Sequence, residues 1–233
     1  MDRGTVQQGI SRTWGMAEKL FLAESFSNAA SLPLNEEFRD LIFSPESTYV
    51  DLYLCGLNLS HYNILLKDYS FFQFSFESID NVRYAFYPNP FIKGSSDELE
   101  NFKRRRELVT AEMITHEEYL SMIDGDTKSS GVPMFRYENA PGQRKKFAHP
   151  CSHFHIGFHS ENRWPISRLL TPYAFSMLVF KAFYGDQWKM FGSREHPDID
   201  NKFDEYLINE KTNCRLIEND LFEDVEQRSF FFG

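Results

Sequence analysis

The chain has 233 residues, of which 42% are hydrophobic and 16% aromatic, and its formal net charge is −9 at pH 7. A hydrophobic fraction of this size argues against a disordered chain and supports a folded core. The negative charge argues against a protein that binds nucleic acid with its whole surface, because neutralising phosphates requires many lysines and arginines. Contact with nucleic acid would therefore need a local basic patch or a basic partner.

The cysteines and the apolar segments predict a soluble, cytoplasmic protein that does not span a membrane. Cys55, Cys151 and Cys214 are odd in number and far apart, which indicates a reducing compartment rather than a disulfide framework. The N-terminal segment contains no apolar run typical of a signal peptide. The most apolar stretch, residues 174–184, is shorter than the about 20 residues that a membrane-spanning helix needs.

The first half of the chain predicts helices followed by a pair of strands. The spacing of apolar residues predicts three helices, over residues 11–30, 35–43 and 47–66, the last broken near Gly56. Residues 69–76 and 81–87 are short, aromatic and separated by a turn, which is typical of two antiparallel strands.

The second half predicts two further strands among helices. The expected strands cover residues 133–138 and 145–157, and Pro141-Gly142 forms the turn between them. The expected helices cover residues 97–123, with a candidate break at Thr110, a segment that starts at Thr171-Pro172, and residues 198–208. Residues 124–131 have the composition of a flexible loop. We therefore expect one α+β domain over residues 1–233, with a mostly antiparallel sheet of about four strands flanked by helices.

Chemistry concentrates in one histidine run, AHPCSHFHIGFHS. Four of the seven histidines of the chain, His149, His153, His155 and His159, lie within it. On a strand over residues 145–157, the first three share one face with Cys151, because side chains alternate with period two. His153 and His155 would then lie roughly 6.6 Å apart along the strand, close enough to converge on one metal ion or one phosphate.

The run is open to three interpretations. An HxH pair on a strand is a zinc-binding arrangement, although no carboxylate lies in the run and a further ligand must come from elsewhere. A histidine pair can instead serve as acid and base in phosphodiester cleavage, without a metal. In the third interpretation, the histidines form a structural cluster of hydrogen-bonded side chains and have no catalytic or metal-binding role. Gly157 would end the strand and allow a substrate or a backbone to approach closely.

Basic side chains near the run and elsewhere are candidates for phosphate contact. Arg163 and Arg168 follow the histidines, and their guanidinium groups suit phosphate oxygens. Two basic runs could form a nucleic-acid patch, or could be ordinary solvated surface; their members are Lys103, Arg104, Arg105, Arg106, Arg144, Lys145 and Lys146.

For two weaker motifs we favour a structural role over a catalytic one. Asp126-Thr127-Lys128 matches half of a nuclease pattern, but it lies in a Gly/Ser-rich segment where a solvated turn is the simpler interpretation. Cys151 could be a nucleophile beside the histidines, although a buried small hydrophobic residue is the commoner role.

Three segments together resemble a bacterial family known as domain of unknown function 2290. They are HYNILLKDYSFFQF, RYAFYPNPF and HPCSHFHIGFHSENRWPISRLLTPYAF, and the likeness covers most of the chain. The positions that match the HxHxG pattern of the family are His149, His153, His155, Gly157 and Arg163. The resemblance implies a bacterial protein that acts with a helicase partner in antiphage defence, and it assigns no reaction.

We therefore carry two hypotheses. In the first, the protein is an effector that cleaves or modifies nucleic acid together with a helicase, and its catalytic residues are His149, His153, His155, Arg163 and Arg168, with a divalent metal ion as an optional cofactor. In the second, it is a non-catalytic partner that binds and regulates the helicase, which its acidic charge would also suit.

Overall fold

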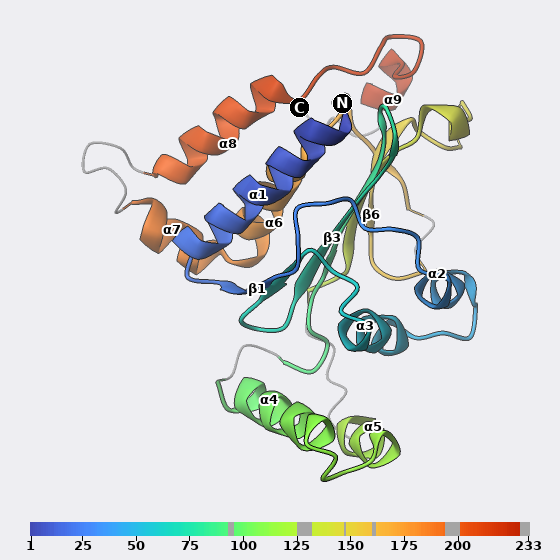
Figure 1. The fold of residues 1–233 in the computed structure, drawn as a ribbon. Coiled ribbons are helices and arrows are strands. Elements are labelled where there is room, and N and C mark those ends of the chain that lie inside the picture. Colours follow the sequence, from blue (N-terminus) through green and yellow to red (C-terminus); the bar gives the residue numbers. More distant parts are fainter. Residues whose placement is uncertain (93–95, 125–131, 147, 160–161, 194–200, 229–233) are drawn as a thin grey trace.

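The computed structural model describes residues 1–92, 96–124, 132–146, 148–159, 162–193 and 201–228, and its centre is one antiparallel sheet (Figure 1). Each strand pairs with the next one along the sequence, so the order across the sheet is β1-β2-β3-β4-β5-β6-β7. The strands are β1 (Ala23–Phe26), β2 (Ile64–Leu66), β3 (Phe71–Ser78), β4 (Asn81–Tyr87), β5 (Phe135–Asn139), β6 (Ser152–Ile156) and β7 (Trp164–Pro165). This arrangement confirms the predicted α+β class, but the prediction of four strands is wrong, since the described residues form seven.

Helices pack on one face of the sheet and bury its aromatic side chains. They are α1 (Arg3–Lys19), α6 (Pro172–Phe183), α7 (Gly185–Gly192) and α8 (Lys202–Asn213) (Figure 1). Phe72 and Phe74 of β3 and Phe86 of β4 point into this core, where the Phe72 ring packs against Phe86 and edge-on against Phe175 of α6. The predicted start of α6 is confirmed, because the Thr171 side chain caps the helix and Pro172 occupies its first turn.

The helices α1 and α6 approach each other closely at Gly9. A Cβ atom at this position would lie 2.8 Å from Cδ of Pro172, nearer than side chains tolerate. Beside it, the Thr13 hydroxyl lies 3.0 Å from the Ser176 hydroxyl in the same buried contact. Glycine at position 9 therefore sets the spacing of the two helices.

We expect Gly9→Ala to lower the free energy of unfolding by about 1–3 kcal/mol, because the added methyl group overpacks the contact with Pro172. Gly15→Ala is the matched control on the same helix, since nothing lies within 4 Å of its added Cβ. Replacing this partly buried glycine should stabilise the helix by up to about 1 kcal/mol. Urea unfolding of both variants measures the difference, and equal effects would contradict the close approach.

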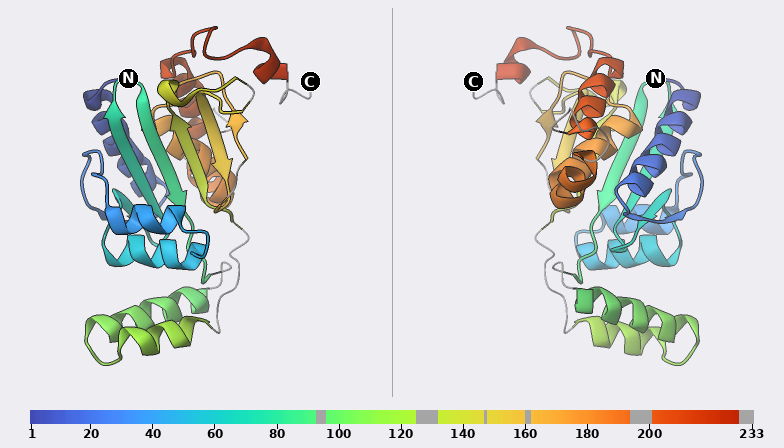
Figure 2. Two further views of the ribbon diagram at one scale, coloured as in Figure 1. Left: turned by 90° about the vertical axis from the view of Figure 1, so that its right-hand side faces the viewer. Right: turned by 90° about the vertical axis from the view of Figure 1, so that its left-hand side faces the viewer.

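The described residues cover the opposite face of the sheet only in part. The helices α2 (Glu36–Phe43) and α3 (Tyr49–Asn58) lie across one end of it, and the pair α4 (Ser96–Thr110) and α5 (His116–Asp124) lies beyond that end (Figure 2). A second core forms beneath α2 and α3, where Phe38, Tyr53, Phe71 and Tyr87 stack on one another. The rest of this face carries the polar side chains described below.

Two predicted helices near the N-terminus are partly wrong. The helix expected over residues 11–30 begins at Arg3 and ends at Lys19, because Phe21 takes a left-handed backbone conformation with φ 57° that terminates it. The strand β1 follows. The segment 47–66 contains α3 and then the strand β2, and Gly56 lies inside the helix, where an added Cβ would meet the ring of Phe71 at 2.8 Å.

The strand expected over residues 145–157 is shorter than predicted. A tight turn forms first, in which Lys145 and His149 exchange backbone hydrogen bonds, and β6 begins only at Ser152. Pro150 lacks an N–H group and cannot take part in a ladder, which accounts for the late start. Gly157 ends β6 as predicted, with φ 91° in the left-handed region that glycine tolerates best.

The remaining predictions are confirmed or lie outside the described residues. The expected helix over residues 35–43 matches α2, and the break at Thr110 separates α4 from α5. A short 3-10 turn, η1 (Pro141–Gln143), follows β5 where a turn was predicted, and α9 (Asp224–Arg228) lies near it. Residues 125–131 of the predicted loop, with Asp126-Thr127-Lys128, lie outside the described residues, as do residues 198–200 of the helix expected over residues 198–208. The described part of that predicted helix belongs to α8, which ends later than expected, at Asn213. Among the helices of the described ranges, none combines the length and apolar character that crossing a membrane demands.

Candidate functional site

Alternation along the strands gathers charged side chains on the face that α2 and α3 leave open. Across the sheet, Arg83 of β4 pairs with Glu138 of β5, and Glu138 pairs with His153 of β6. One row further along, Arg136 of β5 pairs with His155 of β6. Their neighbours in sequence, such as Tyr84 and Tyr137, point into the aromatic core on the other face. The three strands therefore build a polar patch from alternate positions.

This patch forms the floor of a hollow of about 470 Å³. The walls come from α2 and from the segment that follows β6, which brings Phe158, His159 and Arg163 to the same space. Its charged and imidazole side chains from the sheet and from the connections around β6 are Arg83, Arg136, Glu138, His149, His155, His159 and Arg163. Four of these residues were singled out from the sequence, namely His149, His155, His159 and Arg163. The other three, Arg83, Arg136 and Glu138, were not.

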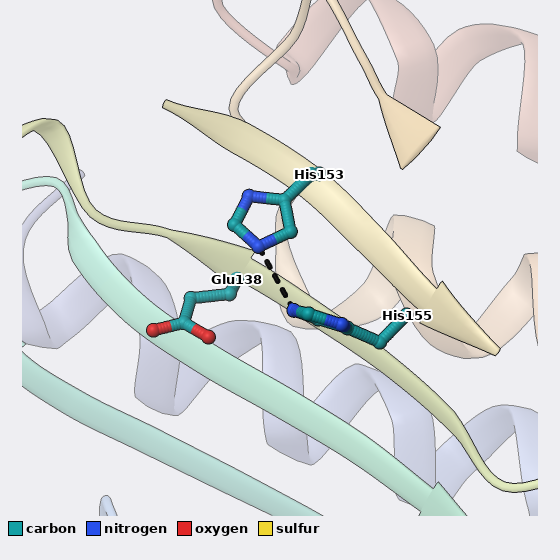
Figure 3. Close-up of side chains that lie close together, drawn as sticks. All are labelled: Glu138, His153 and His155. Carbon is teal, nitrogen blue, oxygen red and sulfur yellow. Dashed lines mark hydrogen bonds between the residues drawn. The ribbon is translucent and has the colours of Figure 1, made fainter. Parts of the chain in front are cut away.

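His153 and His155 point to the same side of β6, as predicted, and their rings meet (Figure 3). The two Nε2 atoms lie 2.9 Å apart, and Nδ1 of His153 lies 2.9 Å from the carbonyl oxygen of Pro150. A carbonyl only accepts, so Nδ1 of His153 is the donor in the second contact. Nε2 of neutral His153 is then the acceptor, and Nε2–H of His155 donates to it. Both rings are buried.

Glu138 lies beside the histidine pair (Figure 3). One carboxylate oxygen of Glu138, one ring nitrogen of His153 and one ring nitrogen of His155 all lie within 4.8 Å of one another. Burial tends to raise the pKa of Glu138, but the charges of Arg83 and Arg136 outweigh it and hold the pKa below its usual value. The carboxylate is therefore ionised at neutral pH, and Arg83 contacts it at 3.3 Å.

Burial lowers the pKa of His153 to about 4, although the nearby carboxylate of Glu138 opposes this shift. His153 is therefore uncharged at neutral pH and holds a lone pair on Nε2 rather than a proton to give away. This environment suits a ligand or a hydrogen-bond acceptor better than a general acid.

The arginines of the hollow have unused hydrogen-bonding capacity. Nε of Arg83, Nε of Arg136 and Nδ1 of His149 are buried and have no hydrogen-bond partner among the residues that the structure describes. Burial lowers the pKa of Arg136, against the opposing charge of Glu138, but a guanidinium group stays protonated in proteins. Buried N–H groups without acceptors are costly, so this side of the hollow is suited to an anionic ligand.

The structure places Arg168 outside the site. Its Nη1 donates to the backbone carbonyls of Lys211 and Cys214, at the end of α8. The group therefore ties the segment after β7 to α8 and does not reach the hollow.

The two predicted basic runs do not form one surface. Lys103, Arg104, Arg105 and Arg106 lie on α4, at the opposite end of the molecule from the turn that carries Arg144, Lys145 and Lys146 (Figures 1 and 2). Arg144 and Lys146 are also paired with Glu223. A single phosphate-tracking patch built from both runs is therefore excluded by their placement.

Cys151 is not positioned as a nucleophile. It is buried, and burial raises the pKa of its thiol to about 11, so the thiol stays protonated at neutral pH. This supports the structural interpretation, in which Cys151 is a small core residue.

Sequence reasoning missed Arg83, Arg136 and Glu138. Each lies at an alternate position of a segment that was predicted to be a strand, in NVRYAFY and in FRYEN. The sequence does contain a signal for these residues. Each is a charged residue within a predicted strand, next to an aromatic residue that faces the core. Which strands lie next to β6 could not be read from this alternation.

Taken together, the fold and the site define an antiparallel α+β protein with a cationic, histidine-lined hollow on one face of its sheet. Over residues 21–218 the chain matches the family described as an uncharacterized conserved protein (DUF2290). The chain therefore belongs to the DUF2290 family, and the match covers all seven strands. No curated protein and no solved structure matches the chain.

Proposed function

We propose that the hollow binds a phosphodiester of nucleic acid and that the protein cleaves it. The observation that carries this proposal is the charge of the hollow. Arg83, Arg136 and Arg163 line it, whereas Glu138 is the only acidic residue among its described lining residues. This concentration of positive charge occurs in a protein whose formal net charge is −9.

The arginines favour phosphate over other anions. Guanidinium groups donate in a planar fork that matches two phosphate oxygens, and they stabilise the negative charge that develops during cleavage. The unused Nε atoms of Arg83 and Arg136 supply donors from two adjacent strands. A hollow of about 470 Å³ has room for one nucleotide rather than a duplex, so we infer a single-stranded or unpaired substrate.

His149 is the residue that we assign to proton transfer. It lines the hollow, its ring packs edge-on against His153 at 4.9 Å, and its Nδ1 atom has no hydrogen-bond partner within the described ranges. His153 and His155 are instead occupied with each other and with Pro150. This reassigns the acid/base role that the sequence had suggested for the HxH pair.

The biological setting of the proposal is antiphage defence together with a helicase. Its support is the family resemblance of the sequence, and the acidic charge of the chain fits a protein that depends on a basic partner to reach nucleic acid. In the alternative proposal the protein only binds and regulates the helicase, and the histidines are structural. The burial of His153 and His155 is the observation that favours this alternative.

The test is cleavage of labelled single-stranded DNA, single-stranded RNA and duplex DNA by the purified chain, with and without a helicase partner, in divalent metal ions and in chelator. We expect cleavage of a single-stranded substrate and a loss of about 10²–10⁴-fold in rate for His149→Gln, because proton transfer contributes about this much to catalysis. His61→Gln is the control, since His61 also lines the hollow but lies on the α3 side, against Phe38.

If His149→Gln retained its activity, His149 could not be the residue that transfers the proton. The absence of cleavage under all conditions, with a stable helicase complex, would overturn the enzymatic proposal and support the regulatory one.

A further inference from the structure

The second feature of the site is a set of three buried groups that can act as metal ligands. Glu138 offers a carboxylate from β5, and His153 and His155 offer imidazole nitrogens from β6, all within 4.8 Å of one another (Figure 3). The residues are 8%, 0% and 4% exposed, respectively. Burying one carboxylate and two imidazoles side by side costs free energy, because each group loses its hydration. An interaction that offsets this cost is therefore expected.

We propose that Glu138, His153 and His155 bind one divalent transition-metal ion, which presents its open coordination positions to the hollow. The three residues form a two-histidine, one-carboxylate set, which holds such ions on one side and leaves the other side free. Imidazole and carboxylate together suit iron, manganese and zinc rather than calcium or magnesium.

The distances agree with this proposal. Two nitrogens that are each about 2.0–2.1 Å from an ion and 2.9 Å from each other subtend an angle of about 90° at the ion. This is the angle between adjacent ligands of a six-coordinate ion. The set therefore matches an octahedral site with three ligands from the protein.

The surroundings of His153 match those of a metal ligand. Its Nδ1–H donates to the carbonyl of Pro150 at 2.9 Å, which fixes the ring and directs the lone pair of Nε2 toward His155 and Glu138. Metal-bound histidines almost always hold their second nitrogen in this way. The turn that delays β6, with Pro150 at its end, supplies this support.

In the metal-free protein a proton takes the place of the cation. Nε2–H of His155 donates to Nε2 of His153, so the hydrogen lies between the two proposed ligand atoms. Metal binding would replace this hydrogen bond, so the proton on Nε2 of His155 would have to pass to the other nitrogen of that ring or to solvent.

This inference about metal binding rests on ligand geometry, whereas a catalytic role for the ion rests on the proposed function. The test is to strip the full-length protein with chelator, add Mn²⁺, Fe²⁺ or Zn²⁺ separately, and measure bound metal by elemental analysis and affinity by calorimetry. We expect about one equivalent of metal, a higher melting temperature on binding, and affinity that weakens at acid pH because imidazole must be unprotonated to bind.

Glu138→Gln should weaken the binding by more than about 100-fold, since loss of a direct ligand exceeds the about 10–100-fold cost of losing its support. His159→Gln is the matched control, because His159 belongs to the same run but lies exposed against the carbonyl of Ser47, and it should bind normally. Wild-type protein that takes up none of the three ions would overturn the proposal, as would equal binding by Glu138→Gln. Cleavage without metal binding would overturn this inference alone, and metal binding without cleavage would overturn the proposed function alone.

Discussion

Replacing Arg136 by methionine should lower the rate of phosphodiester cleavage by about 10²–10³-fold, the usual effect of removing one preorganised donor to a developing anion. Arg136 lies on β5 beside His155, on the floor of the hollow, and its Nε atom has no hydrogen-bond partner in the described part of the chain. Methionine retains the aliphatic part of the side chain, so packing should change little. The measurement is the single-turnover rate on the single-stranded substrate identified above.

Arg168→Met is the matched control for this experiment. The same substitution is made at an arginine that the sequence predicted to be in the site. In the structure this arginine donates to the backbone carbonyls of Lys211 and Cys214, at the end of α8. Its rate per folded molecule should stay near that of the wild type, although its melting temperature should fall. An equal loss of activity in both variants would contradict the assignment of Arg136.

The largest effect on stability should follow Arg12→Met. Arg12 on α1 contacts the buried carboxylate of Glu210 on α8 at 2.7 Å, and its guanidinium lies 4.0 Å from the ring centre of Tyr173. Removing it leaves the carboxylate buried without its charged partner. We expect the free energy of unfolding to fall by about 3–5 kcal/mol, measured by urea unfolding.

Glu210→Gln tests the same contact from the other side. The amide oxygen of glutamine can still accept from the Thr171 hydroxyl, which donates to Glu210 at 2.6 Å, and Arg12 is half exposed and remains hydrated. We therefore expect a smaller cost of about 1 kcal/mol. Equal costs for the two variants would show that the buried carboxylate does not depend on Arg12.

Local alternation in the sequence was sufficient to predict the strands β3 and β4 and the common direction of His153 and His155. Period-two alternation depends only on neighbouring residues, so the prediction holds even though β6 is shorter than expected. Helix ends were less predictable. Phe21 is a poor candidate for a left-handed conformation, and nothing in its neighbourhood of the sequence marks it as a helix stop.

The composition of the site was only half predictable. The closeness of Glu138 to His153 depends on the pairing of β5 with β6, which is a long-range property that alternation does not encode. The strands β1, β2 and β7 have between 2 and 4 residues, too few to show a period, so the size of the sheet was underestimated. Arg168 was misplaced because the chain turns between β7 and α6, and only four residues separate it from Arg163.

The strand order has a consequence for the growing chain on the ribosome. Because every strand pairs with the one made just before it, the whole sheet can assemble as the chain is made, and it is complete at Pro165. The helices α6 and α8, which bury the aromatic face of that sheet, are made only afterwards, at residues 172–213. Until then, among the described helices that pack on this face, only α1 is available to shield Phe72, Phe74 and Phe86. The nascent protein therefore passes through a stage with a finished sheet and an exposed apolar face, which is when it is most open to aggregation or to chaperone binding.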